Sequence, residues 1–151
     1  MTGKTGGGRP RRKLTDADYE QLAEFRHLLR HFLIFSEKAA VRSGLAAQQH
    51  QALLAIKGFS RRETMTTGRL AALLGIRHHS AVGLIDRLAA KSLVTRRSAP
   101  DDRRQVLLEL TEEAERILGT LSVAHRDELQ RLAPLLRALL AHFEPGAAAK
   151  H

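Results

Sequence analysis

The chain changes its hydrophobic period within one short stretch, and this change constrains the fold more than any other feature. Between residues 67 and 91, apolar side chains recur every three or four residues, as they do in amphipathic helices. After Ser92 the spacing shortens to every second residue, which is typical of strands. The stretch therefore predicts two helices followed by a β-hairpin, and hence a mostly α protein with a small β-hairpin.

The helical part of this stretch predicts two helices joined by a tight turn. The first begins at Thr66 or Thr67 and ends at Gly75, because threonine caps helix starts and glycine closes helix ends. The second runs from about His78 to Lys91, and five of its residues have the spacing of one buried face. These five are Ala81, Leu84, Ile85, Leu88 and Ala89.

The hairpin is expected directly after the second helix. Leu93–Arg97 is predicted as its first strand and Gln105–Leu110 as its second, with the apolar residues of the second strand on one side. The loop Ser98–Arg103 lies between them and contains a proline. This arrangement places two arginines, Arg103 and Arg104, at the tip of the hairpin.

Two helices are expected before this region. A long amphipathic helix covers Asp16–Ser43, where Asp16 or Asp18 caps the start and Gly44 closes the end. A shorter one follows over about Ala47–Lys57.

Two more helices are expected after the hairpin. Thr111 begins the first, because glutamates follow it and acidic side chains stabilise a helix N-terminus. This helix reaches about Leu132, and Pro134 then lies in the first turn of a last helix that ends near Phe143. The final segment carries more apolar surface than one small domain covers, which favours pairing with a second copy.

Composition excludes several classes of protein. The 151 residues and 43% hydrophobic content fit one compact domain with a tail. The absence of cysteine excludes disulfides, thiolate metal sites and cysteine nucleophiles. No apolar run is long enough to span a membrane, and no apolar segment follows the basic N-terminus, so a cytoplasmic protein is expected.

The net charge of +9 is concentrated in two places. Residues 1–13 contain five basic side chains and no acid, and residues 87–104 contain six basic side chains against two acids. Acids and bases are equal in number elsewhere. A positive excess confined to a tail and one structured region indicates a surface that binds phosphates.

Charge and periodicity together predict a DNA-binding helix-turn-helix with a β-wing. The exposed face of the second helix can lie in a major groove about 12 Å wide, and arginines at the hairpin tip can enter the minor groove. The helix is expected to contact DNA through Arg77, His78, His79, Ser80, Val82, Gly83, Asp86 and Arg87. The hairpin is expected to contribute Arg96, Arg97, Asp102, Arg103 and Arg104. The alternative is an ordinary packed helix followed by a solvated turn.

Over about residues 18–143 the chain resembles the MarR family of winged-helix regulators. The likeness is densest in TTGRLAALLGI, in LIDRLAAKSLVTR and in SAPDDRRQVLLELTEEAERIL. The last segment contains the pair Asp102-x-Arg104 and the helix start Leu110-Thr111. The resemblance implies that Arg104 enters the minor groove while Asp102 orients it or a neighbouring basic residue. It also implies a homodimer in which the first and last helices of two chains intertwine.

The resulting fold prediction is a winged helix-turn-helix DNA-binding lobe plus N- and C-terminal helices that form a dimerisation lobe. Residues 1–13 are expected to be a disordered basic tail, and residues 14–145 a single domain. Within it the DNA-binding lobe covers about 47–111, and the dimerisation helices cover about 16–43 and 112–143.

Two residues depart from the family pattern. Arg77 stands where a small polar residue usually caps the recognition helix, and its charge is unfavourable at a helix N-terminus. Gly83 stands where the family more often has a longer polar residue, and glycine inside a helix costs about 1 kcal/mol relative to alanine. Base preferences of relatives are therefore not transferred to this chain.

The resemblance also implies a pocket for a small aromatic or phenolic anion that releases DNA. The residues expected to line part of it are Phe25, Leu29, Phe32, His50 and Leu54. His27 and His31 have a spacing that could hold a metal, but no third ligand can be assigned, and neither a metal nor a cofactor is expected. No nucleophile, base and orienting group form a recognisable set, so the protein is not expected to be an enzyme.

Three hypotheses of different classes remain. The leading one is a homodimeric regulator that recognises a pseudo-palindromic operator and is modulated by a small ligand. The second is a sequence-indifferent architectural protein that binds double-stranded DNA through its basic tail and wing. The third is a winged-helix module that binds another protein.

Overall fold

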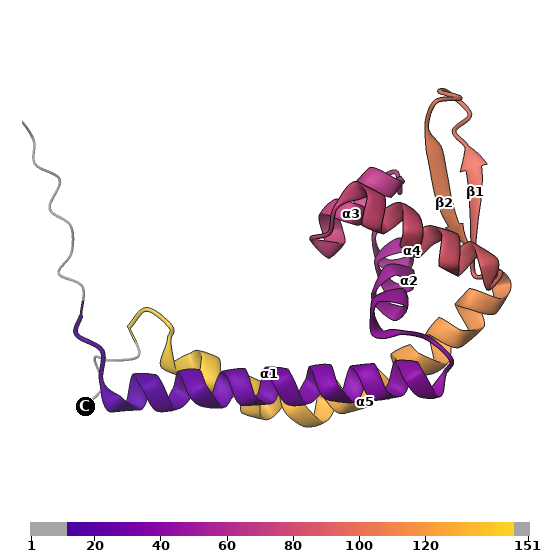
Figure 1. Cartoon of the computed structure of the whole chain (residues 1–151). Helices are drawn as coiled ribbons and strands as arrows, with labels where there is room; N and C mark the ends of the chain where they lie inside the picture. Colours follow the sequence, from indigo (N-terminus) through magenta and orange to yellow (C-terminus); the bar gives the residue numbers. More distant parts are fainter. Residues whose placement is uncertain (1–11, 147–151) are drawn as a thin grey trace, which may run out of the picture. The chain divides into compact units, whose positions relative to one another are not determined.

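A computed structural model describes residues 12–146, and within them it contains five helices and one antiparallel two-stranded sheet (Figure 1). In chain order the elements are α1 (Asp16–Arg42), α2 (Ala47–Phe59), α3 (Thr67–Leu74), α4 (His78–Ala90), β1 (Val94–Ser98), β2 (Val106–Leu110) and α5 (Glu112–His142). The prediction of a mostly α fold with a small β-hairpin is confirmed.

The chain divides into two compact units. The central unit comprises residues 32–131, and the terminal unit comprises the described residues before 32 and after 131. Helices α1 and α5 contribute to both units, whereas α2, α3, α4 and the hairpin belong to the central unit alone. The basic tail expected over residues 1–13 lies outside the described residues, except for the exposed Arg12 and Lys13.

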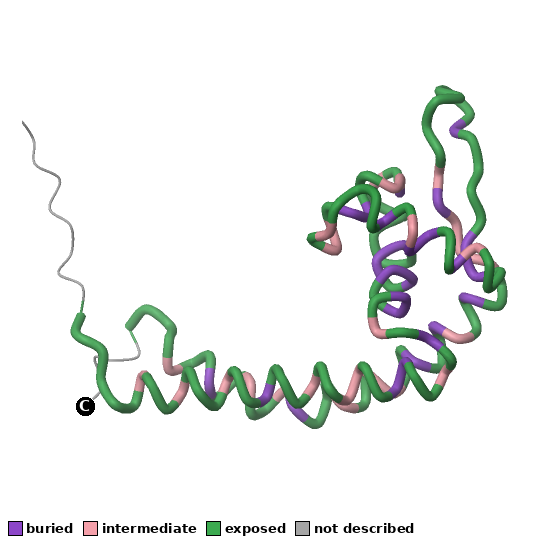
Figure 2. The backbone as a smooth tube through the Cα atoms, in the orientation of Figure 1, coloured by how far each residue is buried: buried purple, intermediate pink, exposed green. Residues whose placement is uncertain are grey.

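The core of the central unit forms around α2. This helix packs against α3, α4 and β2, and α4 also packs against β1. Leu53 of α2 and Ile85 and Leu88 of α4 are completely buried. Figure 2 shows buried positions along both helices. Because each such side chain contributes roughly 1.5–3 kcal/mol on burial, this contact fixes the orientation of α4 in the unit.

Backbone geometry confirms the expected ends of α1 and α3. Gly44 follows α1 and Gly75 follows α3, with φ of 79° and 64°. Glycine adopts this left-handed conformation without a steric penalty. At the start of α3, the Thr66 hydroxyl accepts a hydrogen bond from the Arg69 backbone N–H at 3.1 Å. The turn between α3 and α4 therefore has the chemistry that the sequence predicted.

The hairpin is anchored to the core through the outer edge of β2. Its strands pair in register from Val94 opposite Leu110, and each strand begins one residue later than predicted. On the outer edge of β2, the Leu108 backbone N–H donates to Met65 O at 2.9 Å. Leu108 is itself 2% exposed. The base of the wing is thus part of the core, although most of β1 is exposed.

Helix α5 begins as expected but is longer than expected. The Thr111 hydroxyl caps its first turn and donates to Ser92 O at 2.7 Å. The separate last helix predicted from Pro134 to Phe143 was wrong, because α5 continues through Pro134 to His142. A proline inside a helix costs about 3 kcal/mol. The same apolar stripe continues on both sides of it, where Leu132 and Leu139 are buried, and their packing offsets this cost.

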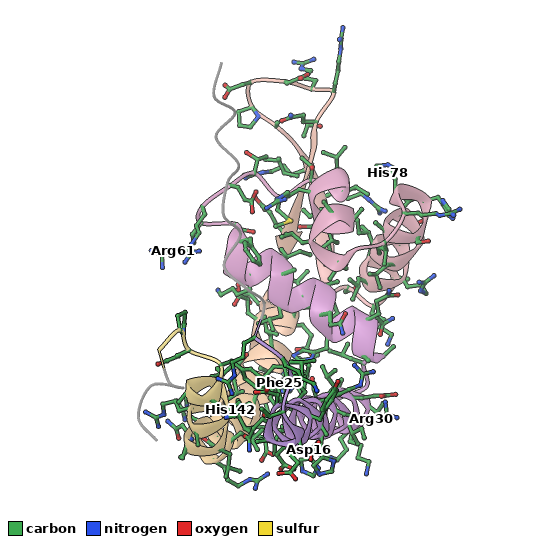
Figure 3. All side chains as sticks on the ribbon, turned by 90° about the vertical axis from the view of Figure 1, so that its left-hand side faces the viewer. Asp16, Phe25, Arg30, Arg61, His78 and His142 are labelled. Atoms are coloured by element: carbon green, nitrogen blue, oxygen red, sulfur yellow. The ribbon has the colours of Figure 1, made fainter. Side chains whose placement is uncertain are left out.

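The terminal unit is held by a polar contact between the start of α1 and the end of α5. His142 Nε2 lies 2.8 Å from Asp18 Oδ1, and Figure 3 shows His142 beside the start of α1. Thr15, and not Asp16 or Asp18 as predicted, caps α1, because it forms a reciprocal capping box with Asp18. Hydrogen bonds to the Asp18 carboxyl lower its pKa to about 2; the backbone N–H of Thr15 has the largest effect and the His142 side chain the next largest.

A second cluster lies inside the central unit, where side chains of α1, α2 and α5 meet around His125. The His125 ring lies 4.8 Å from the His50 ring between centroids, and Phe32 and Phe35 meet it edge-on. Its nitrogens contact Leu121 O at 2.6 Å and the Ser36 hydroxyl at 2.7 Å. These contacts fix the orientation of the imidazole between three helices.

The conformation of Ser92 generates a stability prediction. Ser92 has a φ of 57°, which costs a residue other than glycine roughly 1–2 kcal/mol. Its carbonyl contact with Thr111 does not depend on its side chain. Ser92→Gly should therefore raise the free energy of unfolding by about 1 kcal/mol in urea denaturation.

The matched control is Gly75→Ser, at a position with nearly the same φ. A Cβ atom added there meets nothing within 4 Å, so backbone strain is the main consequence of the substitution. This variant should lose about 1 kcal/mol. If Ser92→Gly proves no more stable than the parent, left-handed strain at the end of α4 is not a cost to the fold.

Burial of His50 generates a pH prediction. His50 is 4% exposed, and this desolvation, with the neighbouring His125, lowers the pKa of His50 below 6.5. The unfolded chain therefore binds the proton more tightly than the folded chain. Stability should fall as the pH drops through 6.5, by at most about 1.4 kcal/mol per pH unit.

Thermal unfolding of the parent and of His50→Gln, followed between pH 7.5 and 5, measures this contribution. The slope of stability against pH should be shallower in His50→Gln. The control His27→Gln removes an exposed imidazole from α1 and should retain the parent slope. Identical slopes in the parent and His50→Gln would show that His50 does not titrate differently on folding.

Candidate nucleic-acid interface

The two faces of α4 differ in the way that its sequence predicted. Ala81, Leu84, Ile85 and Leu88 are buried in the central unit. The residues predicted to contact DNA lie on the other side, and all but the half-buried Gly83 are exposed. They are Arg77, His78, His79, Ser80, Val82, Gly83, Asp86 and Arg87. Figure 3 shows His78 at the exposed start of the helix, directed away from the core.

The two unusual residues of α4 have different local roles. Arg77 occupies the capping position with an extended backbone, and no side-chain hydrogen bond caps the helix there. The first backbone N–H groups of α4 are therefore available to a ligand. Gly83 lies under the Arg87 side chain, whose Nη1 is 3.4 Å from the place where a Cβ would be. A larger residue at 83 would meet the Arg87 guanidinium.

The arginines of β1 are both paired with carboxylates. Arg96 Nη2 contacts Asp86 Oδ1, and this ion pair joins the wing to α4. Arg97 lies 2.8 Å from Glu109 across the hairpin. Two of the arginines predicted to bind DNA are thus already engaged, which the sequence did not indicate.

The wing tip has a different arrangement. The Asp102 carboxylate accepts a hydrogen bond from the Arg104 backbone N–H at 2.9 Å, so it shapes the turn that presents this residue. The Ala99 N–H donates to Gln105 O at 3.0 Å and closes the loop. Arg103 and Arg104 are exposed, and over residues 12–146 neither of them forms an ion pair. The tip therefore carries two cationic side chains that are available to an anion.

A groove lies on another side of the central unit, between the end of α2, residues 61–65 and β2. Its volume is about 670 Å³. Its carboxylates are neutralised by ion pairs. One of these pairs joins α2 to α5, where Lys57 Nζ lies 2.7 Å from Glu115 Oε2. Figure 3 shows Arg61 extending away from the body at its rim. This groove was not predicted from the sequence.

The residues predicted to line an effector pocket belong to both units. Phe25 and Leu29 lie in the terminal unit, and Phe32, His50 and Leu54 lie in the central unit. His50 and Phe32 both contact His125, a residue for which the sequence carried no signal. A separation of 75 residues between two histidines on different helices has no local pattern that could reveal their contact.

Within residues 12–146, no three histidine, aspartate or glutamate side chains are placed to hold a metal ion. His27 and His31 are exposed on α1. None of the described helices combines the length and the apolar character needed to cross a membrane.

Comparison with known proteins shows which proteins the chain resembles. A family model described as MarR family matches residues 43–105, which include α2, the helix-turn-helix and most of the wing. No curated protein sequence gives a significant match.

Solved structures extend the likeness beyond the matched segment. AbsC, a MarR family transcriptional regulator from Streptomyces coelicolor, superposes with a TM-score of 0.65 at 22% identity, over 85% of this chain and 93% of AbsC. CouR from Rhodococcus jostii, bound to p-coumaroyl-CoA, superposes with a TM-score of 0.65 at 23% identity, over 91% of this chain and 99% of CouR. A MepR mutant from S. aureus, bound to an oligodeoxyribonucleotide, superposes with a TM-score of 0.64 at 16% identity, over 87% of this chain and 96% of MepR.

These likenesses agree with the geometry of the interface. The matched segment contains the exposed face of α4 and the arginine-bearing first strand and loop of the wing, and the fold is shared over most of each compared chain. The family is one of transcription regulators and not of enzymes. Residues 43–105 of the chain thus match the MarR family model, and the chain shares the winged-helix fold of solved MarR-family transcriptional regulators.

Proposed function

We propose that the protein is a homodimeric transcriptional regulator that recognises a pseudo-palindromic DNA site. The exposed face of α4 enters the major groove, and Arg104 of the wing enters the minor groove. The observation that carries this proposal is the buried apolar face of α4 together with exposed cations, Arg77 at the start of α4 and Arg103 and Arg104 at the tip of the wing, which form no ion pair within residues 12–146. MepR, which shares the fold, is known bound to an oligodeoxyribonucleotide.

Exposed apolar residues on the two long helices support the proposed homodimer. On α1 these residues include Tyr19, Leu22, Leu29, Leu33, Ile34 and Val41. On α5 they include Val123, Leu129, Leu135 and Leu140. Isologous pairing of two chains would bury such residues. Two copies of α4 related by twofold symmetry would then read half-sites about 34–36 Å apart, which is one turn of DNA.

Modulation by a small ligand is part of the proposal. CouR shares the fold and is known bound to p-coumaroyl-CoA. The candidate contacts in this chain are the five residues named above, of which Phe32 and His50 surround His125 inside the central unit. A small aromatic or phenolic anion would find ring surfaces and an imidazole there. A cytoplasmic location is part of the proposal, because a transcriptional regulator must reach DNA.

Arg104→Ala tests the role of the wing. Loss of a side chain that enters the minor groove should weaken binding to the preferred duplex by about 1–3 kcal/mol. The slope of the logarithm of affinity against the logarithm of salt concentration should also become less steep by about one, which corresponds to one lost phosphate contact. Fluorescence anisotropy with labelled duplex at several salt concentrations measures both quantities.

The control for this experiment is Arg116→Ala. Arg116 is an exposed arginine on α5 that pairs with Glu113 at 2.5 Å, outside the helix-turn-helix and the wing. Its removal should change the affinity by less than about 0.5 kcal/mol. Equal affinities for the parent and Arg104→Ala would remove the wing from the mechanism.

Selection of bound sequences from random duplexes at a fixed salt concentration tests the whole proposal. A regulator should enrich a palindrome whose half-sites are one DNA turn apart. An architectural protein would enrich none, and unrelated DNA would compete equally well. The absence of an enriched motif would therefore replace the proposed function with the sequence-indifferent alternative.

A further inference from the structure

We infer that Asp86 is a positioning residue, whose carboxylate holds Arg96 and thereby fixes the wing against the recognition helix. This inference rests on the proposed function, because it assigns Asp86 a role in DNA recognition other than contact with a base. The observation is the ion pair between Arg96 Nη2 and Asp86 Oδ1. Over residues 12–146 it is the only side-chain ion pair that joins α4 to β1.

The core holds the hairpin as far as the level of Arg96, since Leu108 of β2, which pairs with Arg96, is buried and its backbone N–H donates to Met65 O. On β1, the ion pair of Arg96 adds a contact beyond the buried Val94. Val94 is the one buried residue of β1, and the four that follow it are exposed. Four residues of strand extend about 13 Å, so a tilt of roughly 10° at the base would move the end of the strand by about 2 Å. A displacement of that size would separate a wing arginine from a DNA phosphate or base edge. Arg96 lies two residues beyond Val94, at the point where the strand leaves the core.

The charges around Asp86 favour positioning over base reading. Asp86 is the sole acid of α4, on a face that also carries Arg87 and two histidines. An unpaired carboxylate on this face would be repelled by DNA phosphates. Its contact with Arg96 makes the pair neutral as a whole. Arg96 is the less exposed partner, at 38% of its side-chain surface against 60% for Asp86.

The same pairing predicts how Asp86 contributes to specificity. When Asp86 holds Arg96, the guanidinium is not free to bind phosphates of any sequence. If Asp86 is neutralised, Arg96 can contact the DNA backbone while the wing loses its fixed orientation. Binding to the preferred duplex should then weaken, and binding to random duplex should not weaken with it.

The wing can be observed without DNA, because the chain contains no cysteine. Spin labels at Ala72→Cys on α3 and Asp101→Cys in the wing loop report the distance between helix-turn-helix and wing. Both positions are exposed, and α3 packs against α4. The distance distribution should broaden in Asp86→Asn and narrow again in the charge swap D86R/R96D. An unchanged distribution in Asp86→Asn would overturn the inference, whatever the protein binds.

Binding measurements with the full chain then separate positioning from base reading. Asp86→Asn should lower the affinity for the preferred duplex about tenfold and leave the affinity for random duplex equal or higher. The affinity of the charge swap should be at least threefold higher than that of Asp86→Asn, because the swap restores the ion pair with its charges exchanged. A base-reading carboxylate predicts the opposite, since an arginine at position 86 cannot accept a hydrogen bond from a base. A swap no better than Asp86→Asn would therefore overturn the inference.

Glu109→Gln is the matched control. It removes a carboxylate from the other arginine pair of the hairpin, which joins β1 to β2 and not to α4. The affinity should change less than twofold, and the label distribution should stay narrow. If the parent shows no preferred duplex, the proposed function fails, whereas the spin-label comparison still decides whether Asp86 positions the wing.

Discussion

The packing of α4 against the core of the central unit determines where the other parts of the interface lie. Leu84, Ile85 and Leu88 are buried against a core to which α2 contributes Leu53 and Ile56. Because successive residues of a helix point around its axis, burial of this stripe turns the opposite face to solvent. The chain also reaches β1 only three residues after α4 ends. The orientation of one helix therefore sets both the exposed face of α4 and the base of the wing.

Electrostatics then refine what packing has arranged. The positive excess of residues 87–104 is partly neutralised within the central unit, since Arg96 pairs with Asp86 and Arg97 with Glu109. Paired arginines bind phosphates less readily, because an existing carboxylate contact must first be broken. The exposed Arg87, Arg103 and Arg104 remain available. The cations available to a phosphate are thus fewer than composition indicates, and they lie on α4 and at the tip of the wing.

Sequence reasoning predicted those features that depend on local chemistry. The turn at Gly75, the cap at Thr66 and the change of period after Ser92 each follow from the residues involved and their immediate neighbours. Pro134 misled the prediction because its local signal favours a helix start, whereas burial of a continuous stripe on α5 depends on packing partners distant in sequence.

Contacts between distant residues had no signal of their own. Asp86 and Arg96 are ten residues apart on elements of different type, so neither helical nor strand periodicity relates them. His50 and His125 meet only because α2 and α5 pack together with part of α1. Sequence therefore predicted which residues are exposed on α4 and the wing, whereas the pairing of charges among them depends on how α4 and the two strands pack in the folded protein.

The position of the His125 cluster constrains any mechanism of ligand control. His50 precedes Leu53 and Ile56 on α2, and these two side chains belong to the core that also buries α4. A ligand beside His50 would act on the helix that supports the recognition helix, and it would not need to touch DNA. It can release DNA only to the extent that it binds the DNA-free arrangement of α2 and α4 more tightly than the DNA-bound one. By linkage, the preferred duplex must then weaken binding of that ligand by the same factor.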